Sequence, residues 1–182
     1  ITVTGGEPLM QVDFLIELFT LAKRKGIHTC IDSSGIAFNR KNENFLAKMD
    51  KLVTLTDLVM LDIKHIDPEK HIELTAQPNE NILDFARYLN EKQVPMWIRH
   101  VVVPGITDDD EYLYKLGSFI GEFTNLKALE TLPYHTMGTV KYENLGIEYK
   151  LKDVPPMDKS IMPEKRKVIL QGIKDRRKEL GM

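Results

Sequence analysis

The sequence predicts an α/β protein built around a parallel sheet. Five short apolar runs rich in β-branched residues alternate along the chain with segments of helical periodicity. Successive strand–helix units imply parallel strands joined by right-handed crossovers. An open doubly wound sheet and a (β/α) barrel both satisfy this pattern. No internal repeat, low-complexity segment or linker interrupts the sequence, so we expect one domain over residues 1–182.

The first two strand–helix units occupy the N-terminal quarter of the chain. Ile1–Thr4 is a predicted strand that ends at two glycines. Val12–Arg24 carries apolar residues at helical spacing, and Gly26 follows at the position of a helix C-cap. Ile27–Asp32 is the second predicted strand, ended by a Ser-Ser-Gly turn, and Asn42–Met49 is the helix after it.

The third strand has the most distinctive pattern. Asp57–Ile63 is a nearly continuous apolar run, typical of a strand that is buried on both faces. The later predicted elements are helix Ile82–Lys92, strand Val94–Val103, helix Asp110–Thr124, strand Leu126–Leu132 and a charged terminal helix at Pro163–Leu180. Between the last two lies a polar stretch, His135–Asp158, with little periodicity.

Composition and charge exclude several classes of protein. The chain is 42% hydrophobic and 29% charged, as globular proteins are, and its net charge of −2 gives no general case for binding nucleic acid or a membrane surface. No apolar run is long enough to cross a bilayer. The single cysteine, Cys30, excludes an internal disulfide or a multi-cysteine metal site within these residues and favours a cytoplasmic location. Because the chain opens on Ile1 instead of Met, we expect it to be the C-terminal portion of a longer, N-terminally incomplete protein.

Every predicted strand delivers an ionisable residue to the same rim. Parallel α/β proteins bind ligands at the C-terminal ends of their strands. The first three strands end in Glu7, in Asp32 and in Asp62 with Lys64, the fourth carries Arg99, and the fifth ends at His135 after Tyr134. Their mixed signs suit a zwitterion, with its ammonium on the acids and its carboxylate on the bases, and a metal cation bridging two acids also fits.

Each of these residues also has a purely structural interpretation. Gly5-Gly6 can form a tight turn, Asp32 can cap one, and Asp62 and Lys64 can pair with each other. Arg99 inside an apolar strand needs a partner in either case. We expect Cys30 to be a buried, inert thiol, and the Asp-rich loop before Asp110 to cap the following helix.

The string GGEP at the first strand end resembles the motif with which radical S-adenosylmethionine (SAM) enzymes contact the methionine amino group. The strings GIHTCIDSSG, TDLVMLDIKHID, FARYLNEKQVPMWIRHVVVPGITDDDE and LETLPYHTMGTVKYENLGIEYKL resemble the enzymes that activate glycyl radical enzymes, above all those that activate pyruvate formate-lyase. The resemblance covers residues 1–158.

This resemblance implies a fold and a reaction. The fold is the partial (β/α) barrel of the radical SAM type, of which this chain would hold five βα units and lack the first. A [4Fe-4S] cluster, reduced by a flavodoxin-type donor, cleaves SAM, and the resulting radical abstracts hydrogen from a glycine of the partner. The partner implied is a glycyl radical enzyme, favoured to be pyruvate formate-lyase.

The resemblance also assigns residues, position by position. Those matching the SAM site are Gly5, Gly6 and Glu7 at the amino end of the methionine, and Lys64, Arg99, Val101 and His135 along the rest. Those matching a monovalent cation site beside SAM are Asp32, which borders SAM as well, Ser33, Met60 through its carbonyl, and Asp62. No catalytic residue is assigned within the chain.

The sequence departs from the family at two points. Ser33 stands where the family usually has threonine, and the serine keeps the hydroxyl group. The C-x3-C-x2-C motif that binds the cluster is absent, and Cys30 alone cannot replace it, so we expect the cluster ligands upstream of residue 1 and the chain alone to be inactive.

Three hypotheses of function follow. The chain is part of an active glycyl-radical activating enzyme, or it is a non-catalytic domain that binds SAM, a cation or a partner protein. The third is a metal-dependent (β/α) lyase that uses Asp32, Asp62 and Lys64.

Overall fold

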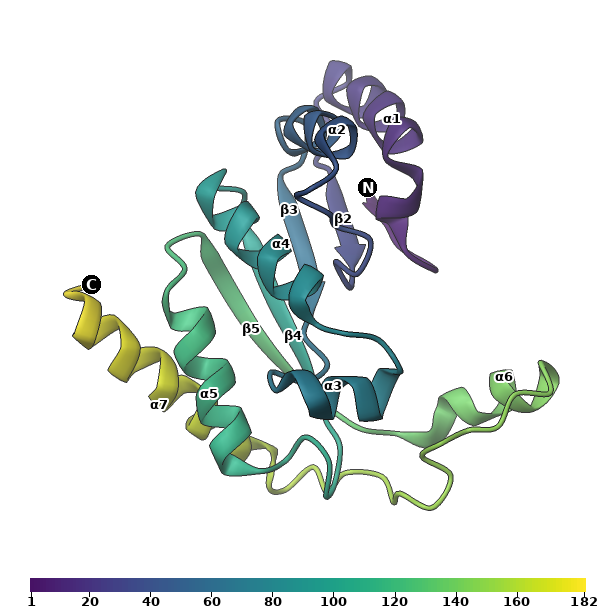
Figure 1. Cartoon of the computed structure of the whole chain (residues 1–182), viewed down its shortest axis with the longest axis vertical. Helices are drawn as coiled ribbons and strands as arrows, with labels where there is room; N and C mark the ends of the chain where they lie inside the picture. The colour runs from purple at the N-terminus through teal and green to yellow at the C-terminus, as the bar shows by residue number, and fades with distance from the viewer. The chain divides into compact units, whose positions relative to one another are not determined.

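The computed structural model describes residues 1–182 except for the side chain of Lys141. It confirms the α/β class, with one five-stranded sheet in the order β1-β2-β3-β4-β5 (Figure 1). The strands are β1 (Thr2–Val3), β2 (Cys30–Ser33), β3 (Leu58–Asp62), β4 (Met96–Val102) and β5 (Leu126–Pro133). The pairs β1–β2, β2–β3 and β3–β4 are parallel, as the alternation of strands and helices predicts.

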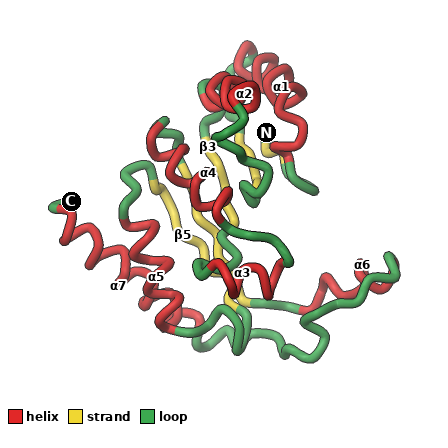
Figure 2. Tube along the Cα trace, in the orientation of Figure 1, coloured by secondary structure: helices red, strands yellow, loops and turns green.

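Helices separate the strands along the chain (Figure 2). The α-helices are α1 (Val12–Arg24), α2 (Glu43–Val53), α3 (Pro68–Thr75), α4 (Glu80–Glu91), α5 (Asp110–Gly121), α6 (Thr139–Asn144) and α7 (Met162–Leu180), and the 3-10 turns are η1 (Pro8–Gln11) and η2 (Thr136–Gly138). None of the helices in the described part of the chain has the length and apolar character needed to cross a membrane.

The chain folds as two compact units. The first comprises residues 1–99 and 123–130, and the second comprises residues 100–122 and 131–182. The expected single domain over the whole chain stays a prediction.

In the first unit, alternate residues of the strands face the helices. Val59 and Leu61 of β3 and Met96 and Ile98 of β4 are fully buried, whereas the residues between them are partly exposed. An aromatic cluster of Phe38, Phe45, Phe85 and Tyr88 extends this core, with ring centroids 5.0–6.5 Å apart. The residues that alternate with the buried ones therefore form the other face of β3 and β4, which can carry polar side chains.

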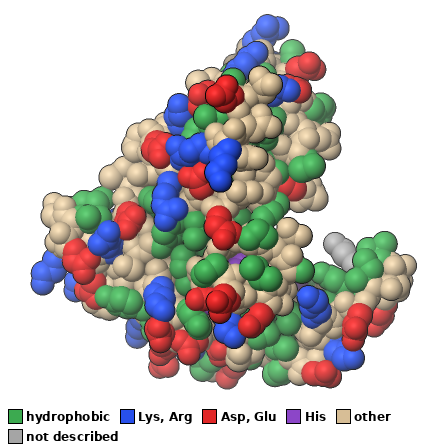
Figure 3. Space-filling view, in the orientation of Figure 1, with side chains coloured by type: hydrophobic (Ala, Val, Ile, Leu, Met, Phe, Trp, Pro, Cys, Tyr) green, Lys and Arg blue, Asp and Glu red, His purple; other side chains and the backbone are tan. Residues whose placement is uncertain are grey.

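The helices of the first unit carry a mixed-charge outer surface. Figure 3 shows acidic and basic side chains interspersed over α2 and α4. Arg40 pairs with Asp84 and Glu91, and Lys92 pairs with Asp50. This interspersion matches the near-neutral net charge of −2.

In the second unit, α5 and α7 lie side by side (Figure 1), and glycines let their backbones approach closely. A Cβ placed on Gly117 would lie 2.1 Å from the backbone oxygen of Ile169, and one on Gly172 would lie 2.4 Å from that of Tyr114. A smaller core of Val102, Val103, Tyr134, Met157 and Met162 lies in the same unit.

Two elements differ from the sequence prediction for identifiable reasons. The second strand starts at Cys30 instead of Ile27, because the amide of Ile27 donates to Ala22 in the C-terminal turn of α1 (3.0 Å), where Gly26 has a φ of +67° as a C-cap glycine does. Helix α3 was not predicted, since His71 is its only buried residue and apolar periodicity is absent.

Candidate functional site

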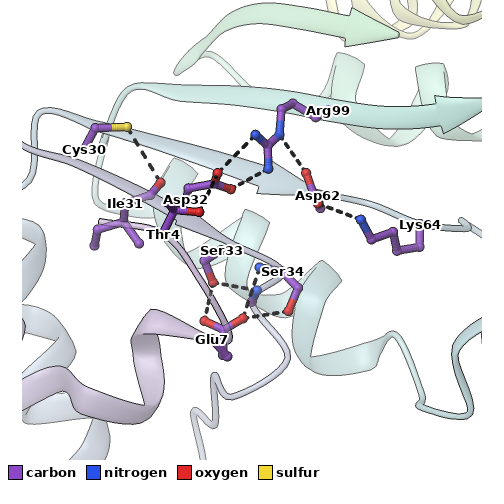
Figure 4. Close-up of polar contacts among 11 residues, drawn as sticks. Thr4, Glu7, Cys30, Ile31, Asp32, Ser33, Ser34, Asp62, Lys64 and Arg99 are labelled. Atoms are coloured by element: carbon purple, nitrogen blue, oxygen red, sulfur yellow. Dashed lines mark hydrogen bonds and ion pairs between the residues drawn. The ribbon is translucent and has the colours of Figure 1, made fainter. Parts of the chain in front are cut away.

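Four charged side chains of the first unit form one connected cluster: Asp32 of β2, Asp62 and Lys64 at the end of β3, and Arg99 of β4 (Figure 4). The sheet register places Asp62 beside Arg99 and Asp32 beside Met60. The guanidinium of Arg99 donates from Nε to Asp62 (2.7 Å) and from both terminal nitrogens to Asp32. Lys64 donates from Nζ to the other oxygen of Asp62 (2.7 Å). The predicted need of Arg99 for a partner is confirmed. Asp62 and Lys64 do pair with each other, which the sequence left open as one of two interpretations.

This cluster is largely shielded from water. The side chains of Arg99, Asp32 and Asp62 are 19%, 17% and 21% exposed. Burial alone would lower the pKa of Arg99, but the carboxylates of Asp62 and Asp32 outweigh it and raise that pKa. Two cations therefore face two anions, and the cluster is close to electrically balanced.

The loop after β1 presents the remaining acid. Gly5 and Gly6 have φ of +93° and +53°, which L side chains rarely adopt, and a Cβ there would meet no atom within 4 Å. The glycines thus serve the turn and leave the space above it open. The carboxylate of Glu7, half-buried, accepts hydrogen bonds from the loop after β2 and from the amide of Leu9.

Glu7 differs from the other acids in its partners. Its donors are hydroxyls and amides of Ser33, Ser34 and Leu9, and no ion pair involves it among the residues that the structure describes. The charge of Glu7 is the uncompensated one in this region, so the rim carries a net negative charge beside the glycine turn.

The four residues assigned to a monovalent cation lie together, but their oxygens already have partners. Asp32 and Asp62 both bind Arg99, and the hydroxyl of Ser33 donates to Glu7 (2.6 Å). Within the described residues no group of three or more His, Cys, Asp or Glu side chains is arranged to hold a metal ion. The cation assignment, including the carbonyl of Met60, stays a prediction.

The remaining assigned residues, Val101 and His135, belong to the second unit. Val101 is partly buried and packs against the small core of that unit. His135 is exposed and precedes the 3-10 turn η2. Their participation in the site stays a prediction.

The fit to an iron–sulfur cluster fails within this chain. Cys30 is the only cysteine in the sequence and is 4% exposed inside β2, where burial raises the pKa of its thiol. A [4Fe-4S] cluster needs several thiolates. The assignment of Asp32, Lys64 and Arg99 to SAM stays a prediction. The expectation of a buried thiol is confirmed.

The sequence prediction missed two residues of this network. Thr4 donates from Oγ1 to Asp32 (3.1 Å), and Ser34 donates to Glu7 from both its amide and its hydroxyl. Both directly adjoin strand ends, and the small hydroxyl side chain next to a predicted acid was the available signal. The Asp-rich loop caps α5 as predicted, with Asp109 accepting from the amides of Glu111 and Tyr112.

The model of the radical SAM superfamily matches residues 1–117. The chain therefore belongs to the radical SAM superfamily, whose members use SAM and a [4Fe-4S] cluster.

Individual relatives identify the family within this superfamily. The chain is 50% identical over 169 residues to the pyruvate formate-lyase-activating enzyme of Listeria monocytogenes, covering 93% of this chain and 68% of that protein. It is 50% identical over 173 residues to that of Staphylococcus epidermidis, covering 94% and 68%. The chain belongs to the pyruvate formate-lyase-activating enzyme family.

A solved structure has the same fold. The crystal structure of a domain of pyruvate-formate lyase-activating enzyme from Bacteroides vulgatus superposes with a TM-score of 0.73 at 21% identity, covering 94% of this chain and 93% of that one. The predicted fold class of the radical SAM type is thereby confirmed.

Proposed function

We propose that the chain is the SAM-binding part of an enzyme that activates pyruvate formate-lyase by SAM-dependent hydrogen abstraction from a glycine. The supporting observation is the connected strand-end cluster of Asp32, Arg99, Asp62 and Lys64 beside the Gly5-Gly6 turn. The relatives with 50% identity are named for this activity. The cluster that drives SAM cleavage in this superfamily would be held by cysteines outside these 182 residues.

Charge supports SAM as the ligand. SAM carries a sulfonium, an ammonium and a carboxylate, and its net charge is +1. The described rim is balanced except for Glu7, so its net charge complements that of SAM. Arg99 and Lys64 would receive the carboxylate of SAM, and the Gly5-Gly6 turn would receive its amino end.

The monovalent cation is a second part of the proposal. Asp32, Ser33, Asp62 and the carbonyl of Met60 supply the oxygen ligands that such a cation prefers. Its binding would compete with Arg99 for the same carboxylates. We further propose a flavodoxin-type electron donor, a single radical SAM domain and a cytoplasmic location.

Calorimetric titration of the chain with SAM tests the central proposal. We expect saturable binding that is weakened at least about tenfold in Arg99→Gln, because a carboxylate partner is lost. The control is Lys115→Gln, which removes an exposed cation from the surface of α5 and should leave SAM binding unchanged. Absence of SAM binding to the unsubstituted chain would refute the proposal.

The single cysteine favours the alternative that these residues form a non-catalytic binding domain. Both proposals predict that the chain alone forms no radical, so the test uses the full-length protein that contains these residues. Anaerobic treatment of that protein with iron, sulfide and a reductant, followed by EPR after addition of pyruvate formate-lyase and SAM, separates the two. A glycyl radical on pyruvate formate-lyase would refute the alternative. SAM binding without that radical would support it for this chain.

A further inference from the structure

The carboxylate of Glu7 has its hydrogen-bonding capacity filled by its own protein. Oε1 accepts from the amide of Leu9 (3.1 Å) and the hydroxyl of Ser33 (2.6 Å), and Oε2 accepts from the amide (3.1 Å) and hydroxyl (2.6 Å) of Ser34. An ionised carboxylate offers about four acceptor positions. A ligand ammonium would have to displace a protein donor to reach Glu7 directly.

These bonds connect two loops that lie far apart in the sequence. Glu7 ends the glycine turn after β1, whereas Ser33 ends β2 and Ser34 begins the loop after it, 26 and 27 residues later. Ser34 contributes both of its donors to one oxygen, and its own Oγ accepts from the amide of Ile36 (3.4 Å). Figure 4 shows the carboxylate of Glu7 directed at the two serines.

We propose that Ser34 is a positioning residue for SAM binding, acting through Glu7 to hold the Gly5-Gly6 turn in its ligand-receiving conformation. The turn needs such an anchor, because both glycines have positive φ and no side chain of their own to fix it. Glu7 then acts on the ligand through its charge and through the turn, instead of through a direct hydrogen bond. This inference rests on the proposed function for the identity of the ligand.

Hydrogen exchange of the turn tests the anchor without any ligand. The amide of Leu9 donates to the carboxylate of Glu7 (3.1 Å) and the amide of Met10 donates to its carbonyl (3.1 Å), so their exchange reports on the anchored turn. In Ser34→Ala we expect these two amides to exchange about tenfold faster, since the stronger of the two Ser34 bonds is lost. Ser34→Thr keeps a hydroxyl and should restore most of the protection. Thr54→Ala is the matched control: it deletes an exposed hydroxyl that bonds only the carbonyl of Lys51, and should leave the turn unchanged.

Titration with SAM tests the functional consequence. We expect the dissociation constant to rise about tenfold in Ser34→Ala and to recover in Ser34→Thr, with Thr54→Ala like the unsubstituted chain. If Ser34→Ala fails to fold, Glu7→Asp replaces it, since the shortened carboxylate withdraws from both serines and should loosen the turn equally.

The outcomes separate the two proposals. Unchanged exchange at the amides of Leu9 and Met10 in Ser34→Ala, or an equal change in Thr54→Ala, would overturn the positioning role. A chain that binds no SAM at all would refute the proposed function, and the exchange measurement would still decide whether Ser34 anchors the turn.

Discussion

Charged side chains make the contacts between β2, the end of β3 and the middle of β4, whereas backbone makes the contacts between α5 and α7. Arg99 bridges two carboxylates that belong to different strands. Gly117 and Gly172 instead remove their side chains so that two helices can touch. A charged contact can be rearranged when a ligand with matching groups arrives, whereas a steric contact has one geometry only. We therefore expect ligand binding to act on the first region and stability to depend most on the second.

We expect the largest loss of stability from a substitution that disrupts the close contact between α5 and α7. Gly117→Ala should lower the free energy of unfolding by about 3 kcal/mol, because its Cβ would lie 2.1 Å from the backbone oxygen of Ile169 and a helix must shift. Urea denaturation measures the change. Gly138→Ala is the control, since a Cβ there meets nothing within 4 Å, and it should change stability little. Equal stability of the two variants would contradict the close contact.

The next effect removes the central charge of the first region. Arg99→Met leaves Asp32 and Asp62 without their shared cation in a site about one-fifth exposed, and should destabilise the chain by about 2 kcal/mol. Adding Asp32→Asn removes the carboxylate that is left uncompensated, since Lys64 still pairs with Asp62, and should restore about half of that loss. Thermal unfolding of the single and double variants measures both. An unaltered melting temperature in Arg99→Met would show that the guanidinium is not needed there.

The same contrast explains what the sequence could predict. Alternation of strands with helices and the run at Asp57–Ile63 sufficed for the parallel sheet, and the register of parallel strands then brings their terminal charges together. Motif and position therefore identified Asp32, Asp62, Lys64 and Arg99 as neighbours. Their exact pairing was not predictable, because several pairings of two acids and two bases satisfy the same pattern.

The steric contact gave no comparable signal. Both helices were predicted, yet glycines at 117 and 121 are equally compatible with a helix that packs elsewhere, and only the position of α7 shows why they are needed. Ser34 was missed for a related reason, since its role depends on Glu7 lying 27 residues away in sequence.

A charged contact at the opposite end of the sheet sharpens the comparison. Asp57, at the start of β3, pairs with Lys23 and accepts from the amide and hydroxyl of Thr29. Partial burial would raise the pKa of Asp57, but these partners outweigh it and lower the pKa to about 2, from an ordinary 3.8.

This shift predicts a pH dependence of stability. Because the folded-state pKa is depressed, the stabilisation is fully present above pH 3.8 and is lost as the pH falls toward 2. Asp57 is one-third exposed, so we expect only about 1 kcal/mol after screening by solvent. Asp57→Asn should flatten the stability profile between pH 4 and 2, measured by urea unfolding. A profile as steep as that of the unsubstituted chain would assign the acid sensitivity to other carboxylates.

The smallest effect concerns backbone strain alone. Ala76 ends α3 with a φ of +59° and a ψ of +19°, a left-handed conformation that is unfavourable for a residue with a Cβ. Ala76→Gly should therefore raise the free energy of unfolding by about 0.5 kcal/mol. Ala47→Gly, on an exposed position of α2, should lower it by up to about 1 kcal/mol, because glycine weakens a helix interior. Chemical denaturation should show that the free energy of unfolding rises in Ala76→Gly and falls in Ala47→Gly. A decrease in both variants would show that position 76 carries no backbone strain. Neither change involves a charge or a close contact, so this pair isolates backbone conformation from the side-chain effects that distinguish the two larger regions.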